Sequence, residues 1–405
     1  MWDVIVGGGG ASGMVCALEC AARGLSVLLL EKNKKLGRKL LLTGAGRCNL
    51  LNEVASLDDF PCGQELAKNV LAQWPTSRLK EYFQQLGLAL SVGPDNRIFP
   101  QTDRAQSVVE VLHMALLEKN VSIEFGQRIE KLEKTKDGFV IKTTKSTFQG
   151  KHFVLAFGGQ SYGRTGSSGE GYELARTLSH TIDETCPALV PLRAKLGPFH
   201  KLQGQKWRCG LTLYDGQRKL CHSVGDVMWT SYGLSGLAIL DVTAKAPLPS
   251  YEGLRLTLNL FPHFRKPKDF LRQRASNHPQ RTLKELFVGL LPKKIVKVCL
   301  PLALRDNQLK VPVKELDLEL IDKVAEKLSS LSMTLTGATG WEQAQVTAGG
   351  VSLSEVDLQS CQSKKMSRVY IIGEVLNAHG LSGGYNLHLA WATAMLAAHS
   401  ISKEC

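Results

Sequence analysis

The sequence has no long hydrophobic run, which argues against a membrane-spanning helix. Its longest apolar segments, such as LSVLLLE, have the length of a β-strand, whereas a transmembrane helix needs about 20 apolar residues. The first residues, MWDVIVGG, contain neither the basic segment nor the long apolar segment of a secretory signal peptide. The sequence therefore predicts no membrane insertion and no secretion signal.

The chain also lacks the cysteine patterns of disulfide scaffolds and metal sites. None of its 10 cysteines forms a C-x-x-C motif, and none lies at zinc-ligand spacing from a histidine. Cys16 and Cys20 are one helical turn apart among alanines, a pattern that favours small core residues. We expect no metal site, no disulfide framework and a reducing, cytoplasmic environment.

Acidic residues are scarce in the middle of the chain. The segment from Arg193 to Lys310 contains 21 Lys and Arg but only 7 Asp and Glu, a net charge of +14, while the whole chain carries +13. This segment either forms a solvated basic surface or attracts an anionic partner such as a CoA thioester, a nucleotide or RNA. It has few clustered aromatic residues for base stacking, which argues against RNA.

The N-terminal segment has the pattern of a β-α-β unit. A short apolar run, Trp2 to Val6, predicts a strand, and an alanine-rich segment from about Ser12 to Arg23 predicts a helix that Gly24 ends. Ser26 to Leu30 predicts the second strand, and Glu31 follows it. This order of elements is typical of a dinucleotide-binding domain.

Three glycines in the turn of this unit match the pattern G-x-G-x-x-G at Gly8, Gly10 and Gly13. Gly8 permits the tight turn, Gly10 lets a pyrophosphate approach the backbone, and Gly13 lets the helix pack closely on the strand. The helix N-terminus then offers free N–H groups to phosphate. Glu31, 18 residues after Gly13, can accept a hydrogen bond from a ribose 2′-OH and disfavours a 2′-phosphate. The tightly bound ligand is therefore predicted to be FAD or NAD and not NADP.

The glycine-rich stretch GRKLLLTGAGRCNLLN, from Gly37 to Asn52, suits close wrapping over a long cofactor. A plain NAD dehydrogenase continues from its second strand into another crossover helix, so this loop favours FAD. Arg38, Lys39 and Arg47 are expected near phosphate. Cys48 has no second cysteine four or five residues later, which argues against a disulfide reductase. Cys48 is expected to be a small residue that faces the cofactor.

Seven segments carry a resemblance to a known family, and they occur in this order: GRKLLLTGAGRCNLLN, IFPQTDRAQSVVEVL, LAFGGQSYGRTGSSGEGYELARTLSHTI, PALVPL, YGLSGLAIL, VTAGGVSL and GEVLNAHGLSGGYNLHLAWA. They look like the BaiN/YhiN-type (HI0933-like) family of bacterial NAD(P)/FAD-dependent oxidoreductases, and the similarity covers nearly the whole chain. The resemblance implies FAD binding, a glutathione-reductase-type fold and an inserted domain. One class of members reduces C=C bonds in bile-acid-like steroids, and most members have no assigned substrate.

The expected fold class is α/β: a FAD-binding Rossmann-type (glutathione-reductase-like) domain with an inserted β-rich domain and a small helical domain. The expected boundaries are 1–186 for the first part of the FAD-binding domain, 187–265 for the β-rich insert, 266–332 for the helical insert, 333–346 for a return strand of the β-rich insert, and 347–405 for the C-terminal part of the FAD-binding domain. Within the β-rich insert, YDGQ predicts a hairpin and GDVMWTSYGLSGLAIL is assigned to strand.

The resemblance also implies further cofactor contacts. Related flavoproteins pass a backbone amide near adenine at the position of Ile129, and a strand ending like FVLAFGG crosses beneath the cofactor. A Gly-acid pair, here Gly373 and Glu374, holds a ribityl hydroxyl, and the helix that begins at GGYNLHLA points its N-terminus at the flavin pyrimidine. The residues expected to bind FAD are Gly8, Gly10, Ala11, Ser12, Gly13, Glu31, Lys32, Arg38, Lys39, Thr43, Gly44, Gly46, Arg47, Cys48, Asn49, Ile129, Ala156, Gly158, Gly159, Gly373, Glu374, Gly384, Tyr385, Asn386 and Leu387.

The sequence shows no Ser/His/Asp triad and no second G-x-G-x-x-G between residues 100 and 350. Hydride transfer is therefore expected to be the chemistry of the flavin, with NAD(P)H as a donor that binds transiently. A C=C reductase also needs a proton donor, and the candidates are Tyr162, Tyr232, His379 and Tyr385, each of which could instead have a core or hydrogen-bonding role. Family members often carry acidic residues after GEVL, where this chain has NAH, so no loop carboxylate is carried over from the family.

These observations favour a FAD-dependent oxidoreductase that uses NAD(P)H to reduce a C=C bond in a conjugated small molecule. An anionic or CoA-linked substrate would suit the basic insert. One alternative is a flavoprotein that acts on RNA, whose affinity would fall steeply with salt. Another is a non-catalytic flavin redox sensor, which would bind FAD tightly and turn over no nicotinamide.

The placement of the cofactor can be tested at the second glycine of the motif. We expect Gly10→Val to yield soluble protein without flavin, because the side chain would occupy the space of the pyrophosphate. The measurement is the ratio of flavin absorbance to protein absorbance after purification. Stoichiometric FAD in the variant would contradict this placement.

Overall fold

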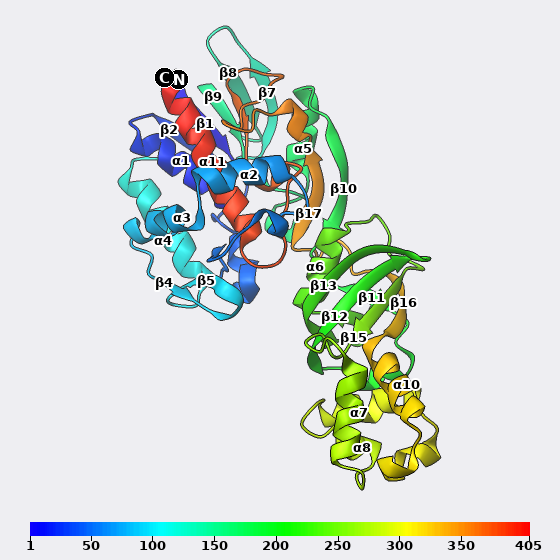
Figure 1. Cartoon of the computed structure of the whole chain (residues 1–405). Coiled ribbons are helices and arrows are strands. Elements are labelled where there is room, and N and C mark those ends of the chain that lie inside the picture. Colours follow the sequence, from blue (N-terminus) through cyan, green and yellow to red (C-terminus); the bar gives the residue numbers. More distant parts are fainter. The chain divides into compact units, whose positions relative to one another are not determined.

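The computed structural model describes residues 1–305 and 308–405, and the chain divides into two compact units. Unit 1 comprises Met1–Ala188 and Trp341–Cys405, and unit 2 comprises Leu189–Gly340 (Figure 1). Each unit has its own hydrophobic core. Unit 2 is thus inserted between two segments that together form unit 1.

The central sheet of unit 1 has five parallel strands in the order β6-β2-β1-β9-β18. Their bounds are β1 Trp2–Gly7, β2 Val27–Glu31, β6 Ser122–Phe125, β9 Thr147–Leu155 and β18 Val369–Ile371. Two antiparallel strands, β7 (Ile129–Lys134) and β8 (Phe139–Thr143), extend the sheet from β9. Every residue of β2 is buried, as expected of a parallel strand covered on both faces.

Six α-helices belong to unit 1: α1 (Ala11–Ala22), α2 (Gln64–Gln73), α3 (Thr76–Gln85), α4 (Ala105–Glu118), α5 (Glu170–Thr177) and α11 (Tyr385–Glu404). Two small sheets complete it: β3 (Leu51–Asn52) with β5 (Arg97–Pro100) and β4 (Leu90–Val92), and β10 (Ile182–Ala188) with β17 (Val346–Val351). The alanine-rich helices α1 and α11 pack together, and Cys16 and Cys20 are fully buried in α1. The expected core role of these two cysteines is confirmed.

Unit 2 is built on a closed barrel with the strand order β11-β14-β13-β12-β15-β16. The strands are β11 Leu192–Ala194, β12 Lys206–Asp215, β13 Arg218–Trp229, β14 Gly233–Ser235, β15 Arg255–Asn259 and β16 Leu331–Ala338. Its helices are α6 (Leu237–Lys245), α7 (Pro267–Asn277), α8 (Leu283–Leu286), α9 (Lys293–Cys299) and α10 (Leu318–Ser329), and a 3-10 helix, η5, spans Gly197–Leu202. The hairpin expected at YDGQ joins β12 and β13, since Asp215 pairs with Arg218.

One part of the β-rich assignment was wrong. The end of GDVMWTSYGLSGLAIL is not a strand, because helix α6 begins at Leu237. Gly236, with φ +98°, forms its N-cap, and Ala238, Ile239 and Val242 are buried on the side that packs on β13. An apolar run this short does not distinguish a strand from a buried helix, so packing on the barrel decided the outcome.

None of the helices among the described residues combines the length and the apolar character needed to cross a membrane.

His388 allows a test of the packing of α11. Its side chain is fully buried, its Nε2 lies 2.8 Å from the Trp74 carbonyl oxygen, and burial lowers its pKa to about 4. The unfolded chain therefore takes up a proton near pH 6.5, whereas the folded chain does so only near pH 4. This contribution to stability is fully present above pH 6.5 and is lost as the pH falls toward 4.

We expect His388→Gln, which keeps an N–H donor for Trp74 but does not titrate, to lose less stability on acidification than the wild type. The difference in unfolding free energy should reach about 3 kcal/mol across this pH range. The measurement is urea unfolding of both proteins at several pH values. Parallel pH profiles would show that His388 is not buried in its neutral form.

Candidate cofactor and active site

The turn between β1 and α1 combines tight packing with open space. Gly8 has φ +106°, and a Cβ there would lie 2.5 Å from the Ala156 carbonyl oxygen. A Cβ on Gly13 would collide with the Gly8 carbonyl oxygen. A Cβ on Gly10, by contrast, would meet no atom within 4 Å. Gly8 and Gly13 therefore serve the packing, and Gly10 borders space that a pyrophosphate could fill.

The helices α1 and α11 of unit 1 begin without a capping side chain, and α1 begins at this space. Gly10 is the N-cap of α1 and Gly384 is the N-cap of α11, and neither helix has an acidic residue in its first turn. The first N–H groups of α1 are thus available to a negatively charged ligand, and the start of α11 presents the positive end of its helix dipole. The loop before α11 reaches the first turn of α1, since a Cβ on Gly373 would lie 2.5 Å from Ser12 Oγ.

The Glu31 carboxylate orders the edge of the glycine turn at the end of β2. Only 7% of the residue is exposed. Its Oε2 accepts the Gly9 N–H at 2.8 Å, and its Oε1 accepts the Asn33 N–H at 2.7 Å. Glu31 thus lies beside the turn that the sequence assigns to a dinucleotide, and its contact with ribose stays a prediction.

Lys32 and Arg38 connect this edge to the glycine-rich loop that follows β9. Lys32 Nζ lies 2.9 Å from Glu170 Oε2 and donates to Ser168 Oγ at 3.1 Å. Arg38 Nη2 donates to the Arg164 carbonyl oxygen at 2.9 Å. Both cations are therefore held against residues 164–170, and the contact of Arg38 with phosphate stays a prediction.

The stretch from Gly37 to Asn52 wraps tightly because several of its residues are left-handed. Gly44 and Ala45 have φ +57°, and Cys48 has φ +59°. The Cys48 N–H donates to the Thr43 carbonyl oxygen at 2.9 Å, and its side chain is fully buried. Burial raises the pKa of the Cys48 thiol to about 12, so this thiol stays neutral and is a poor nucleophile at physiological pH.

The two polar neighbours of Cys48 face different surroundings. Arg47 Nε lies 2.5 Å from Asp103 Oδ1, and the guanidinium stands 4.2 Å from the centre of the Phe99 ring. Asn49 Oδ1 is buried and has no hydrogen-bond partner among residues 1–305 and 308–405. A buried amide oxygen without a donor is suited to a ligand that brings one.

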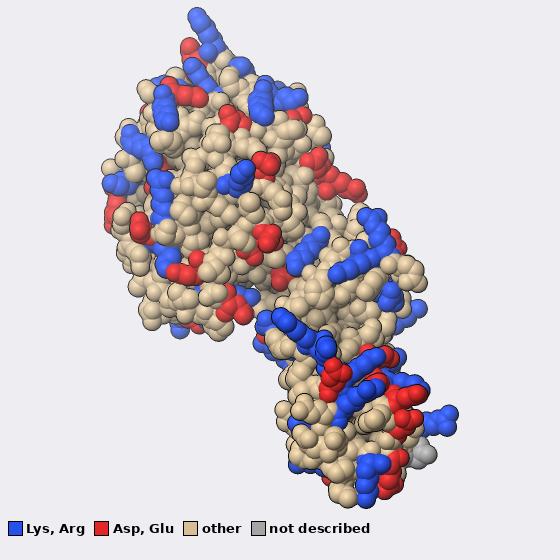
Figure 2. Space-filling model, in the orientation of Figure 1, with Lys and Arg blue, Asp and Glu red and all other residues tan. Residues whose placement is uncertain are grey.

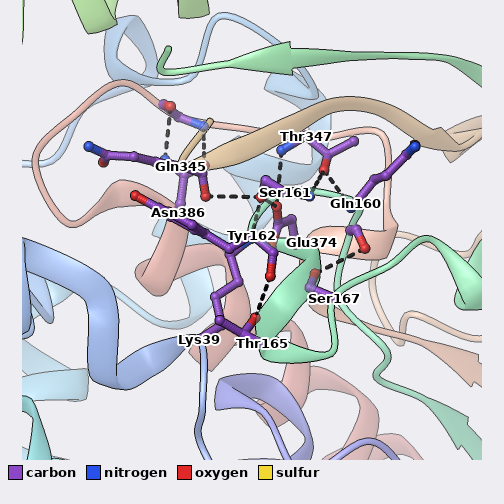
Figure 3. A network of polar contacts seen from close by, with 12 residues as sticks. Lys39, Gln160, Ser161, Tyr162, Thr165, Ser167, Gln345, Thr347, Glu374 and Asn386 are labelled. Carbon is purple, nitrogen blue, oxygen red and sulfur yellow. Dashed lines mark hydrogen bonds and ion pairs between the residues drawn. The ribbon is translucent and has the colours of Figure 1, made fainter. Parts of the chain in front are cut away.

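Glu374 is the centre of a polar network that joins four distant segments (Figure 3). Lys39 Nζ lies 2.5 Å from both Glu374 Oε2 and Ser161 Oγ. Glu374 Oε1 accepts the Ser161 hydroxyl and the Thr347 N–H, each at 3.0 Å. The Thr347 hydroxyl in turn accepts the Gln160 N–H at 2.7 Å. The sequence pointed to Glu374 and Lys39 but not to Thr347, whose only signal is a polar residue in the otherwise apolar strand VTAGGV.

The remaining residues expected to bind FAD all lie in unit 1, and their contact with the cofactor stays a prediction. The Ala156 N–H donates to the Gly7 carbonyl oxygen at 2.9 Å, and the Gly159 carbonyl oxygen accepts the Ser167 hydroxyl at 2.9 Å. Asn386 uses its side chain to hold the preceding loop, with Oδ1 accepting the Gly380 N–H at 2.9 Å. Ile129 is the first residue of β7, and the others lie in the turns and helix starts already described: Ala11, Ser12, Gly46, Gly158, Tyr385 and Leu387.

The candidate proton donors do not form one cluster. Tyr385 stands edge-to-face on Phe60 with ring centres 5.8 Å apart, and the His379 N–H donates to the Cys62 carbonyl oxygen at 3.3 Å. Tyr162 instead lines a separate cavity of unit 1. Tyr232 belongs to unit 2, where the Arg193 guanidinium lies 5.8 Å from its ring centre.

Asn377 shows why an amide fits where related sequences often carry an acid. Its Nδ2 donates to Asp183 Oδ2 at 2.7 Å, and its Oδ1 accepts the Cys62 thiol at 3.2 Å. A carboxylate at this position would face the Asp183 carboxylate and repel it. The departure from the family pattern is therefore matched by a local partner.

Comparison with known proteins decides the family. The profile described as "HI0933-like protein Rossmann domain" matches residues 2–400. The chain belongs to the HI0933-like family. It is 34% identical over 410 residues to the 3-dehydro-bile acid delta(4,6)-reductase of Clostridium scindens, with 98% of each chain covered. It is 28% identical over 411 residues to the ribosomal RNA dihydrouridine synthase of Escherichia coli, covering 99% of this chain and 98% of that protein.

Solved structures give the same fold for this HI0933-like chain. The 3-ketosteroid delta1-dehydrogenase of Sterolibacterium denitrificans superimposes with a TM-score of 0.51 at 13% identity, with 100% of each chain covered. The open conformation of a flavocytochrome c3 fumarate reductase gives a TM-score of 0.51 at 14% identity, covering 99% of this chain and 78% of that one. The predicted family and the Rossmann-type α/β fold are thus confirmed.

The role of Cys48 can be tested by a single-atom change. We expect Cys48→Ser to keep its flavin and to retain turnover within about threefold, because a buried neutral thiol takes no part in the chemistry. The measurements are flavin content and the rate of flavin reduction. Loss of turnover with full flavin content would show that the thiol reacts.

Proposed function

We propose that this protein is a FAD-dependent oxidoreductase that reduces a C=C bond conjugated to a carbonyl group. The observation that carries the proposal is the uncapped start of α1 at Gly10, where a Cβ would meet no atom within 4 Å, together with a second uncapped helix start at α11. One helix start suits a pyrophosphate and the other suits the electron-rich ring of a reduced flavin. The family and the fold of the chain agree with this assignment.

Residues of unit 1 would contact the successive parts of FAD, beginning with its adenosine ribose. Glu31 lies where the adenosine ribose would bind, and the N–H groups of α1 beside Gly10 would hold the pyrophosphate. Glu374 would accept a ribityl hydroxyl, and Asn49 Oδ1 offers an acceptor that has no donor among the residues that the structure describes.

Bound FAD supplies the hydride that a C=C reductase adds to its substrate. The first N–H groups of α11 would stabilise negative charge on the ring, since they lie at the positive end of the helix dipole. His379 and Tyr385, on the segment that packs against Cys62 and Phe60, are the side chains of this helix start that can pass on a proton. Tyr162 lies on a different cavity and is the weaker candidate.

The first candidate substrate is a conjugated small molecule such as a steroid enone. Support comes from the 34% identical relative, whose name describes the reduction of a bile acid derivative. A small conjugated ketone needs no more than a groove over the flavin. The basic insert would suit an anionic handle on such a substrate.

A second candidate substrate is a uracil ring in RNA, and the charge of unit 2 is the observation that favours it. Residues 189–340 contain 24 Lys and Arg against 12 Asp and Glu, which is nearly the whole excess of the chain. Dihydrouridine differs from uridine by two hydrogens across a C=C bond, so the flavin chemistry would be the same. The 28% identical relative is named for this product.

The basic charge of unit 2 is concentrated where two acid-free segments pack together. Residues 193–214 and 286–305 contain no Asp or Glu, and η5 and α9 bring them into contact. Lys294 Nζ donates to the Gln203 carbonyl oxygen at 3.0 Å. We call this the basic surface, and its exposed members are His200, Lys201, Lys293, Lys294 and Lys297. Figure 2 shows many Lys and Arg side chains on the visible face of unit 2, with acidic side chains mainly at its helical end.

One experiment tests the function and separates the two substrates. We expect the purified protein to show flavin absorbance that bleaches anaerobically with NADH or NADPH. The reduced protein is then given a conjugated 3-ketosteroid or ribosomal RNA that lacks dihydrouridine. The gain of two hydrogens in either substrate, measured by mass spectrometry, would identify the class.

The Lys293→Gln/Lys294→Gln/Lys297→Gln variant serves as a matched control. It should weaken RNA binding and lower the number of counterions released on binding by about three, which makes the affinity less dependent on salt. The steroid reaction should not change. Absence of flavin after addition of FAD would contradict the proposed function. Tightly bound flavin that neither NADH nor NADPH reduces would favour the redox sensor.

A further inference from the structure

A cavity of unit 1 is lined by the glycine-rich loop that follows β9. It measures about 310 Å³ and is lined by Gln160, Tyr162, Gly163, Arg164, Ser168, Trp341 and Glu342. All of these residues belong to unit 1. Ser161, between Gln160 and Tyr162, points the opposite way and donates to Glu374, and Figure 3 shows Gln160 directed away from that carboxylate. Alternate residues of the loop therefore face different sites. Gln160 and Tyr162 line the cavity, and Ser161 contacts Glu374.

The turn that forms one wall of the cavity is held rigidly from behind. The Tyr162 carbonyl oxygen accepts the Thr165 N–H at 2.8 Å, and the Thr165 carbonyl oxygen accepts Asn33 Nδ2 at 3.3 Å. Arg38 donates to the Arg164 carbonyl oxygen at 2.9 Å. With its backbone fixed in this way, Tyr162 keeps φ +55°, an unusual conformation for a bulky residue that is typical of ligand-binding turns.

The side chains of the wall remain available to a ligand. Within the described part of the chain, the guanidinium of Arg164 and the carboxylate of Glu342 form no hydrogen bond or ion pair. Tyr162 and Trp341 are only partly buried and present aromatic surfaces, and the Tyr162 N–H fixes Trp341 by donating to its carbonyl oxygen at 3.3 Å. The cavity thus combines two aromatic rings, one free cation and one free anion.

This set of groups fits a nucleotide better than a simple organic acid. An adenine ring can stack on Trp341 or Tyr162, a phosphate can pair with Arg164, and ribose hydroxyls can donate to Glu342. A steroid acid or an aliphatic carboxylate would use the arginine but would offer no hydroxyl donor to Glu342 and no flat ring to stack on Trp341 or Tyr162. The volume is at the lower end of ligand pockets, which suits one nucleotide and not a whole dinucleotide.

We propose that this cavity binds the adenosine phosphate end of the nicotinamide dinucleotide that reduces the flavin, an inference that rests on the proposed function. The dinucleotide loses a hydride and leaves as the oxidised nicotinamide. The two electrons pass through bound FAD to the C=C bond of the substrate, which gains one hydride and one proton. A pocket lined by side chains needs no glycine-rich turn, because the donor binds only transiently. This agrees with the lack of a second G-x-G-x-x-G motif between residues 100 and 350.

The test compares variants in the anaerobic reduction of the FAD-loaded protein by NADPH and by NADH. We expect Arg164→Met and Trp341→Leu each to raise the apparent Kd of the donor by about tenfold or more, with unchanged flavin content and limiting rate constant. Arg176→Met, in the exposed part of α5, is the matched control and should change nothing. Adenosine 2′,5′-bisphosphate should bind the wild type by calorimetry and bind the Arg164 variant about tenfold more weakly.

The outcomes separate this inference from the proposed function. Unchanged donor affinity in both cavity variants would overturn the cavity assignment. A wild-type protein that dithionite reduces and that then converts a C=C substrate, but that no nicotinamide reduces, would overturn the cavity assignment while supporting the proposed function. If the wild type prefers NADPH and Arg164→Met loses this preference, Arg164 binds the 2′-phosphate. If the variant loses affinity equally for NADPH and NADH, Arg164 binds the 5′-phosphate. Tight binding of coenzyme A with no binding of either dinucleotide would contradict the inference, because the pocket would then serve the substrate.

Discussion

The close backbone contact at the β1–α1 turn is the constraint on which the rest of the structure depends. The Gly8 carbonyl oxygen, the Gly13 Cα and the Ala156 backbone meet with no room for a side chain. This contact lets α1 start directly over the end of the parallel sheet, so its free N–H groups face the space beside Gly10. It also lets the Gly373 loop approach Ser12, which sets where α11 begins. A helix displaced by one side chain would separate the two uncapped starts.

The Glu374 network provides the second constraint, because it ties the two ends of unit 1 together. Lys39 and Ser161 come from the N-terminal part of the unit, and Thr347 and Glu374 come from the part after the insert. About a fifth of each side chain of the Lys39–Glu374 pair is exposed, and the carboxylate also accepts two further hydrogen bonds. A partly buried pair whose remaining acceptors are satisfied is stable and well oriented. The insertion of a whole second unit between these segments therefore leaves the groove intact.

Local patterns explain which features could be predicted. The β-α-β unit, the hairpin at Asp215 and the neutral Cys48 each depend on residues close together in the sequence, where glycine spacing and apolar runs are informative. Helix α6 was missed because five apolar residues fit both a strand and a helix, and only packing on β13 separates them. Thr347 and Asn377 were missed as polar partners because Glu374 and Asp183 are far from them in sequence.

By itself, the sequence determined the cofactor-binding motif, the family resemblance and the excess of basic charge in the insert, since each is a property of residue types at fixed spacing. Only the tertiary structure decided which side chains share a site. It separated Tyr162 from Tyr385, placed Trp341 beside the loop at Arg164, and packed the acid-free segments of η5 and α9 against each other. The physical reason is that these contacts join residues far apart in the sequence. They depend on how the sheets and helices pack together, which the spacing of neighbouring residues does not encode.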